Sequence, residues 1–144
     1  MYYFIKISKI TEKLEKIDSF SMSDFYVEIT YNNSTRITTT KWNNDLPEWN
    51  ETFIFPDRAK NIKISLMENN RWCSSNAVKE EFLEILDDGN LTTTVCSFIE
   101  VEHGYVTVKS AKSQIKIMEN LGSIAQYIGN GFSNLTNELK QLTL

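Results

Sequence analysis

Histidine and cysteine are scarce in this chain of 144 residues, which contains one His and two Cys. Two isolated cysteines, Cys73 and Cys96, are too few for a secreted disulfide scaffold, and with one histidine they cannot supply a tetrahedral zinc site. Nothing in the sequence places His103 beside Cys73, and no glycine-rich phosphate loop is present, so no catalytic group is indicated. We therefore expect two free thiols in a reducing compartment and a protein that is not an enzyme.

The sequence also lacks a strong charge excess and a long apolar run. The formal net charge is −4 and the sequence pI is about 5.1, whereas a protein that wraps nucleic acid normally has a basic excess. No apolar run approaches the roughly 20 residues that span a bilayer, and residues 1–7 lack the basic and apolar regions of a signal peptide. These absences predict an intracellular protein, cytoplasmic or peripheral to a membrane, with no nucleic-acid partner.

Short segments of alternating or β-branched residues occupy most of the chain and are separated by turn residues. Seven or eight such segments, with turns about every 8–12 residues, are typical of a β-sandwich. The sequence therefore predicts an all-β fold, an eight-stranded antiparallel β-sandwich over residues 1–110. The expected strands are 3–8, 25–31, 36–42, 52–55, 62–66, 78–86, 91–101 and 104–108.

Residues 18–55 carry a specific order of loop and strand residues. Asp18 and Asp24 bracket a short loop, and two carboxylates beside alternating strands suit a hard cation better than catalysis. A strand that begins with Phe25-Tyr26-Val27 follows this loop, and Leu46-Pro47-Glu48-Trp49-Asn50-Glu51 precedes a later strand. This order resembles the C2 domain, a calcium- and phospholipid-binding β-sandwich family whose members usually read Asp, five residues, Asp-Pro-Tyr-Val, and later Asn-Pro-x-Trp-Asn-Glu. Phe25 and Leu46 depart from that pattern. The matching positions are Tyr26, Val27, Pro47, Trp49, Asn50 and Glu51.

The resemblance also implies a topology. Because the first strand leads directly to Asp18, no extra strand precedes it, and residues 105–108 are expected to supply the missing strand, as in phospholipase C-like C2 domains.

A calcium site is implied by the resemblance, at the end of the sandwich where the acidic loops of the family meet. Besides Asp18 and Asp24, the residues at the family's ligand positions are Glu68, Asn70 and Asn76. Only three of these five side chains are anionic, and affinity for calcium falls as the ligand charge falls. The expected cofactor is therefore calcium at one weak site at most. The alternatives are no physiological calcium and a purely local role, in which Asp18 and Asp24 cap their own loop.

Lipid contact through the loop tips is the second implication of the resemblance. Phe20 and Met22 lie on the first loop, Trp72 follows Glu68 by four residues, and Arg71 beside it is suited to a lipid phosphate. Exposed aromatic residues on loops favour a bilayer interface, although they also fold back onto sandwich edges. The first functional hypothesis is a non-enzymatic C2-like module that docks peripherally on a phospholipid membrane surface, with calcium weak or dispensable.

After Lys112 the apolar period becomes helical. Spacings of three and four alternate over residues 113–142, which predicts an amphipathic, heptad-patterned C-terminal α-helix with a coiled-coil stripe. Three glycines within it each cost about 1 kcal/mol relative to alanine. Three alternatives are open for this helix: it packs on its own sandwich, it pairs with another chain, or it lies on a membrane. The second functional hypothesis is a protein-interaction or assembly module, a homo-oligomer or a complex with a protein partner, through Met118, Leu121, Ala125, Ile128, Phe132, Leu135, Leu139 and Leu142.

Overall fold

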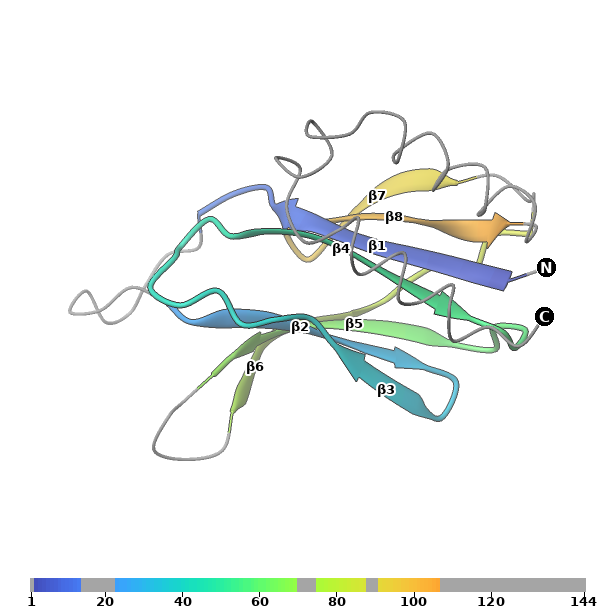
Figure 1. Cartoon of the computed structure of the whole chain (residues 1–144), viewed down its shortest axis with the longest axis horizontal. Coiled ribbons are helices and arrows are strands. Elements are labelled where there is room, and N and C mark those ends of the chain that lie inside the picture. The colour runs from blue at the N-terminus through green and yellow to red at the C-terminus, as the bar shows by residue number, and fades with distance from the viewer. Residues whose placement is uncertain (1, 14–22, 70–74, 88–90, 107–144) are drawn as a thin grey trace, which may run out of the picture.

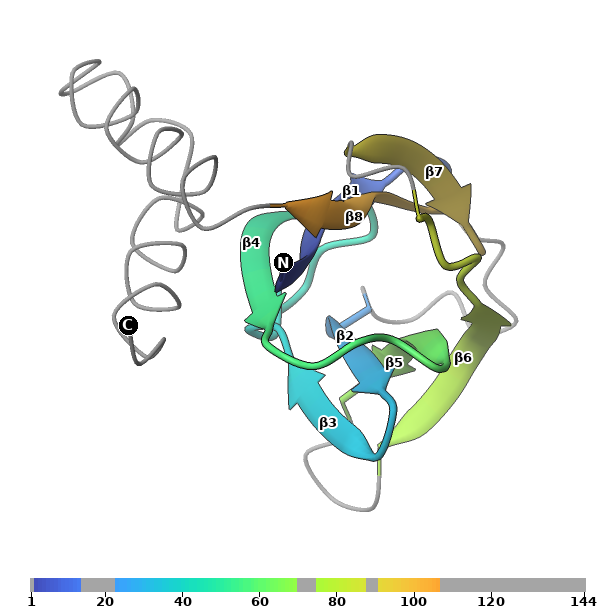
Figure 2. The same ribbon diagram turned by 90° about the vertical axis from the view of Figure 1, so that its right-hand side faces the viewer.

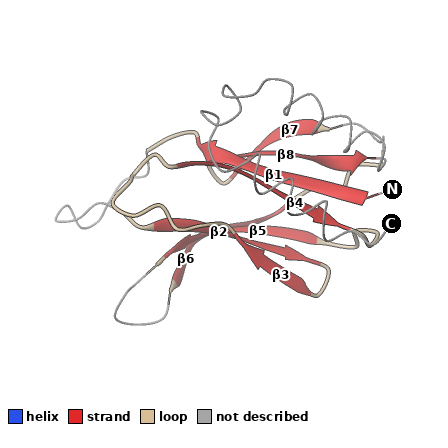
Figure 3. Ribbon diagram, viewed as in Figure 1, coloured by secondary structure: helices blue, strands red, loops and turns tan. Residues whose placement is uncertain are grey.

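The computed structural model describes residues 2–13, 23–69, 75–87 and 91–106. Every regular element in these ranges is a β-strand (Figures 1 and 3). The strands are β1 (Tyr2–Ile10), β2 (Phe25–Tyr31), β3 (Ser34–Ile37), β4 (Glu48–Phe55), β5 (Ile62–Glu68), β6 (Asn76–Phe82), β7 (Thr92–Cys96) and β8 (Ile99–Val106).

Two four-stranded antiparallel sheets, in the orders β4-β1-β8-β7 and β3-β2-β5-β6, form the two layers of a sandwich (Figure 2). This confirms the predicted all-β, eight-stranded fold. The last described strand, β8, pairs with β1 from Val106–Tyr2 to Ile99–Ile10, so residues 105 and 106 of the segment expected to supply the missing strand lie in this sheet. The predicted helix over 113–142 and all eight residues of its apolar stripe lie outside the described residues.

The core between the sheets follows from the alternation of side chains along the strands. In β2, for example, Phe25, Val27, Ile29 and Tyr31 are buried and the residues between them are half-buried. Successive side chains of a strand point to opposite faces, so one face of each sheet supplies the apolar interior. The alternation in the sequence therefore identifies the inward face correctly.

Aromatic rings fill the part of this core that lies near the start of β1. Tyr3 packs edge-on against Tyr105, with 4.7 Å between ring centroids and an interplanar angle of 85°, and Tyr31 stacks on Phe55 at 4.2 Å. The hydroxyl of Tyr31 donates a hydrogen bond of 2.5 Å to the carbonyl of Asp57. The Tyr31 ring is therefore buried without leaving its hydroxyl unpaired, which would be costly.

Asn32 fastens the same end of the molecule. Its Oδ1 accepts hydrogen bonds from the backbone N–H groups of Lys60 (2.6 Å) and Asn61 (3.4 Å), and its Nδ2 donates to the carbonyl of Arg58 (2.9 Å). Asn32 has a φ of 53°, a left-handed conformation that asparagine tolerates better than most residues. One amide side chain thus joins the β2–β3 turn to the β4–β5 loop.

Several predicted strands have different bounds in the structure, and the strand predicted over 78–86 ends at Phe82. Two of the differences have a clear physical reason. The strand predicted over 36–42 is regular only to Ile37, because the hydroxyl of Thr38 replaces a backbone acceptor and takes the N–H of Val27 at 2.9 Å. The segment predicted as one strand over 91–101 is a hairpin in which Ser97 and Phe98 form the turn. The second strand of this hairpin, β8, continues through residues 104–106 of the strand predicted over 104–108, and the last two residues of that prediction lie outside the described residues. Both turn residues have positive φ (46° and 71°), and they lack the Asn-Gly signal that usually marks such a turn.

His103 lies inside the sandwich, with 1% of its surface exposed. Its Nδ1 is 2.8 Å from the hydroxyl of Tyr3 and its Nε2 is 3.2 Å from Oγ1 of Thr94. Burial lowers the pKa of His103, and the charge of Glu84 opposes that shift only in part. The histidine is therefore a core residue in a hydrogen-bonded network.

This burial makes stability depend on pH. Because the folded state favours the neutral imidazole, stability is complete above the ordinary histidine pKa of about 6.5 and is lost as the pH falls below it, by at most about 1.4 kcal/mol per pH unit. We expect a lower Tm at pH 5.5 than at pH 7.5, measured by circular dichroism. The difference should shrink in His103→Gln, and an unchanged pH dependence in that variant would contradict the assignment.

Candidate functional site

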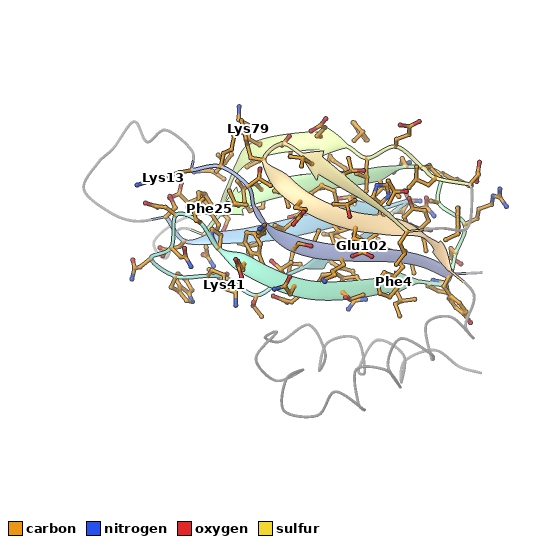
Figure 4. The ribbon with its side chains drawn as sticks, turned by 90° about the horizontal axis from the view of Figure 1, so that it is seen from above. Phe4, Lys13, Phe25, Lys41, Lys79 and Glu102 are labelled. Carbon is orange, nitrogen blue, oxygen red and sulfur yellow. The ribbon has the colours of Figure 1, made fainter. Side chains whose placement is uncertain are left out.

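The candidate site lies at one end of the sandwich, which we call the loop end. It comprises the start of β2 with Ser23 and Asp24 before it, segment 38–47 between β3 and β4, the end of β5 and the start of β6. Figure 4 shows Lys13, Phe25 and Lys41 gathered at this end, with Phe4 toward the other.

The Trp-Asn-Glu motif on β4 holds segment 38–47 in place. The indole Nε1 of Trp49 donates to the carbonyl of Thr39 at 2.8 Å. The carboxylate of Glu51 accepts from the backbone N–H of Thr39 at 3.1 Å and from its hydroxyl at 2.6 Å. Trp49 and Glu51 are 1% and 5% exposed. We call these contacts the Thr39 clamp, because they fix one loop residue from both its donor and acceptor sides.

Beyond the clamp, segment 38–47 runs along the start of β2. Lys41 donates its backbone N–H to the carbonyl of Phe25 at 2.8 Å. The backbone N–H of Asn43 donates to Oδ1 of Asp24 at 2.7 Å. In the opposite direction, the backbone N–H of Ser23 donates to Oδ1 of Asp45 at 2.9 Å. Each carboxylate therefore caps a backbone donor of the neighbouring segment, a role that charged acceptors perform well.

Three further hydrogen bonds fasten the neighbouring loops. The N–H of Asn69, just after β5, donates to the carbonyl of Asp24 at 2.8 Å, and its Nδ2 donates to Oγ1 of Thr40 at 3.2 Å. On the other sheet, the carbonyl of Phe98 accepts from the N–H of Thr11 at 2.7 Å. The residues that leave β1 and β5 are thus tied into the same end of the sandwich.

The β7–β8 turn, whose Phe98 carbonyl binds Thr11, is also joined to the sheet that contains β6. The carboxylate of Glu81 on β6 accepts from the N–H (2.8 Å) and hydroxyl (3.0 Å) of Ser97, and these hydrogen bonds lower the pKa of Glu81. Next to it, burial and then Glu81 raise the pKa of the Cys96 thiol to about 12. Cys96 is a buried free thiol that stays protonated at neutral pH.

Three of the five predicted calcium ligands are described, and the fold brings them to the loop end. Asp24 directly precedes Phe25, which pairs with Glu68, and Glu68 pairs in turn with Asn76. Glu68 and Asn76 are exposed, whereas Asp24 is half-buried and already bonded to Asn43. Within the described ranges, no three acidic, His or Cys side chains lie close enough together to hold a metal. The remaining two ligands, Asp18 and Asn70, lie outside those ranges.

None of the four residues predicted to contact lipid, Phe20, Met22, Arg71 and Trp72, falls within the described residues. The structure instead shows two apolar side chains on segment 38–47 that the sequence analysis does not identify. Trp42 is 45% exposed and Leu46 is 50% exposed. The sequence places Trp42 at the end of a predicted strand, and the neighbouring Asn-Asn-Asp turn is the available signal that it belongs to a loop.

Comparison with known proteins agrees with this architecture. The family model of the C2 domain matches residues 3–84, so the chain belongs to the C2 domain family, a family of membrane-lipid and protein-interaction modules. No curated protein matches. In the described ranges no helix is long and apolar enough to cross a membrane.

Solved structures show the same fold. A C2 domain of a plant extended synaptotagmin 1 is similar at 24% identity and a TM-score of 0.59, over 73% of this chain and 93% of that one. A C2 domain-containing protein from a putative elicitor-responsive gene is similar at 20% identity and 0.58, over 73% and 88%. Human GIVD cytosolic phospholipase A2 is similar at 19% identity and 0.61, over 74% of this chain but only 17% of that enzyme.

The Thr39 clamp should contribute measurably to stability. Replacing Glu51 with Ala leaves the donors of Thr39 without this acceptor, so we expect a loss of roughly 1–3 kcal/mol in the free energy of unfolding, measured by urea denaturation. Glu48→Ala, at an exposed position on the same strand, is the matched control and should change little. Equal effects of the two substitutions would show that the clamp is not a stabilising contact.

Proposed function

We propose that the chain is a non-enzymatic, peripheral membrane-docking module whose loop end contacts phospholipid, with calcium weak or dispensable. The observation that carries this proposal is the pair of exposed apolar side chains, Trp42 and Leu46, on a loop that the Thr39 clamp holds rigidly. An exposed Trp favours the interface between lipid headgroups and acyl chains. A rigid loop loses little conformational entropy when it docks, so more of the apolar contact appears as affinity.

The predicted lipid-contacting residues support the same orientation. Phe20 and Met22 belong to the loop that enters Ser23, and Arg71 and Trp72 belong to the loop that leaves Asn69, so the ends of both loops are tied to the loop end. In this proposal these side chains and Trp42 enter one leaflet together. The activity is binding alone.

Charge contributes little to the proposed docking. Near the described loop end, Lys13 and Lys41 are balanced by Asp24, Asp45 and Glu68, and Nζ of Lys13 lies 3.9 Å from Oδ2 of Asp45. A protein that docks through a basic patch loses affinity as salt screens the attraction. We therefore propose that insertion of apolar side chains dominates, with a weak dependence on ionic strength.

The calcium part of the proposal is limited by the ligand set. Asp24 uses one carboxylate oxygen to accept from Asn43, and Glu68 faces an uncharged partner, Asn76, across the β5–β6 pair. Calcium binds more weakly as carboxylates are replaced by amides. A single weak site, completed by Asp18 and Asn70, is the most that this set supports.

Trp42 gives a direct test of the membrane proposal. We expect Trp42→Ala, and separately Trp72→Ala, to weaken co-sedimentation with phosphatidylserine-containing liposomes roughly tenfold, because each removes a large apolar contact. The matched control is Phe82→Ala, which removes a 71% exposed aromatic side chain from β6, far along the strand from the loop end. Binding by the wild type should persist in chelator and vary little between low and physiological salt.

Two results would contradict this proposal. Absence of liposome binding with calcium and with chelator would exclude membrane docking and leave the assembly hypothesis, which rests on the apolar stripe in 113–142. Equal losses in the Trp42 and Phe82 variants would show that the contact is not at the loop end.

The calcium site can be tested separately by isothermal titration. We expect wild-type affinity no tighter than about 10⁻⁴ M, the range of weak extracellular calcium modules. Glu68→Gln should abolish the binding heat without unfolding the protein, since Glu68 is exposed. Submicromolar binding would contradict the weak site, and unchanged binding in Glu68→Gln would remove this residue from the ligand set.

A further inference from the structure

The outer face of the β4-β1-β8-β7 sheet carries a second, separate apolar group. Tyr3, Ile5 and Ile7 point into the core, so Phe4 between them points away from it, and Phe4 pairs with Ile54 on β4. Neither Phe4 nor Ile54 belongs to the core between the sheets. The residue opposite Phe4 on β8 is Gly104, which has no side chain to cover the ring.

These outward-facing side chains are nevertheless buried. Phe4 is 7% exposed, Ile54 4% and the neighbouring Thr52 3%. Val95, which lies on the same outer face on β7, is 58% exposed. Neighbours within a sheet cover the flanks of a side chain but not its tip, so an outward-facing apolar pair at this position is suited to a further layer over β1 and β4. The second sheet cannot supply it, because it packs on the opposite face.

The apolar group lies where β8 ends. Val106 is the partner of Tyr2, and Gly104, two residues earlier, is the partner of Phe4. Farther along the same face, toward the loop end, the surface becomes polar, and a shallow hollow there is lined by Lys6, Ser8, Lys9, Glu48, Asn50, Thr93, Glu100 and Glu102. The half of the face nearest Val106 is thus the half suited to an apolar partner.

We propose that the segment 107–144 of the same chain docks on this face and buries Phe4 and Ile54. The segment follows Val106 directly, and 38 residues are available, which as a helix of 25–30 residues would reach roughly 40 Å, more than the width of four strands. Its apolar stripe from Met118 to Leu142 is the complementary surface. A covalently attached segment also outcompetes a second copy, because its effective concentration is of order millimolar.

This inference does not depend on membrane docking. It pairs the apolar stripe with a sheet of the same chain, whereas the assembly hypothesis pairs the stripe with another chain. The docked segment occupies the half of the outer face farthest from the loop end. The loop end therefore remains available for its own partner, and the apolar stripe is used within the chain.

Hydrogen–deuterium exchange on the full-length protein tests the docking. We expect amides within 118–142 to be protected in the wild type and to exchange at least tenfold faster in the double variant Phe4→Asp, Ile54→Asp. Amides of β2 and β5 report whether the sandwich remains folded. Val95→Asp, on the exposed part of the same face, is the matched control and should leave the segment protected.

A second variant keeps the test decisive if the first one unfolds. In the full chain, Ile128→Asp with Leu135→Asp should release the segment and raise the fluorescence of an added naphthalene sulfonate dye severalfold, while Gln126→Asp, off the stripe, should not. Unchanged exchange and unchanged dye fluorescence in both double variants would overturn the proposal. Protection that is lost on dilution, with a dimer in sedimentation, would overturn it in favour of a second copy.

Discussion

The contact between Glu51 and Thr39 is the constraint on which the loop end depends. Glu51 is only 5% exposed, and a buried carboxylate is costly unless it is hydrogen-bonded. Its carboxylate accepts from both the N–H and the hydroxyl of Thr39, which lies on the segment between β3 and β4. The contact thus joins β4 to the segment that follows β3. Once Thr39 is held, the backbone beyond it can run along the start of β2. Asp24 and Asp45 then fix this alignment by accepting hydrogen bonds from backbone N–H groups of the neighbouring segment.

This dependence explains why the motif on β4 is so informative in the sequence. Trp49 and Glu51 position a loop residue that lies 10 and 12 residues earlier. Alternating residues identify most strands, and the motif identifies the family. The sequence does not indicate the hairpin at Ser97 and Phe98, because the turn lacks the usual turn residues. Ser97 is held instead by its hydrogen bonds to Glu81 on another strand.

The sequence predicts part of the candidate site, as it predicts most but not all of the strands. Asp24, Glu68 and Asn76 were expected at one end, and strand pairing places them there. Asp45 was missed because its partner, Ser23, lies 22 residues away and no local pattern joins the two. Trp42 was missed because β3 ends where the Thr38 hydroxyl bonds to Val27, a contact between strands that period-2 alternation cannot reveal.

The single amide of Asn32 at the opposite end has a consequence for how such a domain tolerates change. Asn32, Tyr31 and the Tyr105 hydroxyl, which accepts from Ala59, close that end with contacts that depend on exact side-chain length. At the loop end, by contrast, Trp42, Leu46, Glu68 and Asn76 are exposed. Sequence drift can therefore alter the surface of the loop end while the contacts at the opposite end keep the fold unchanged.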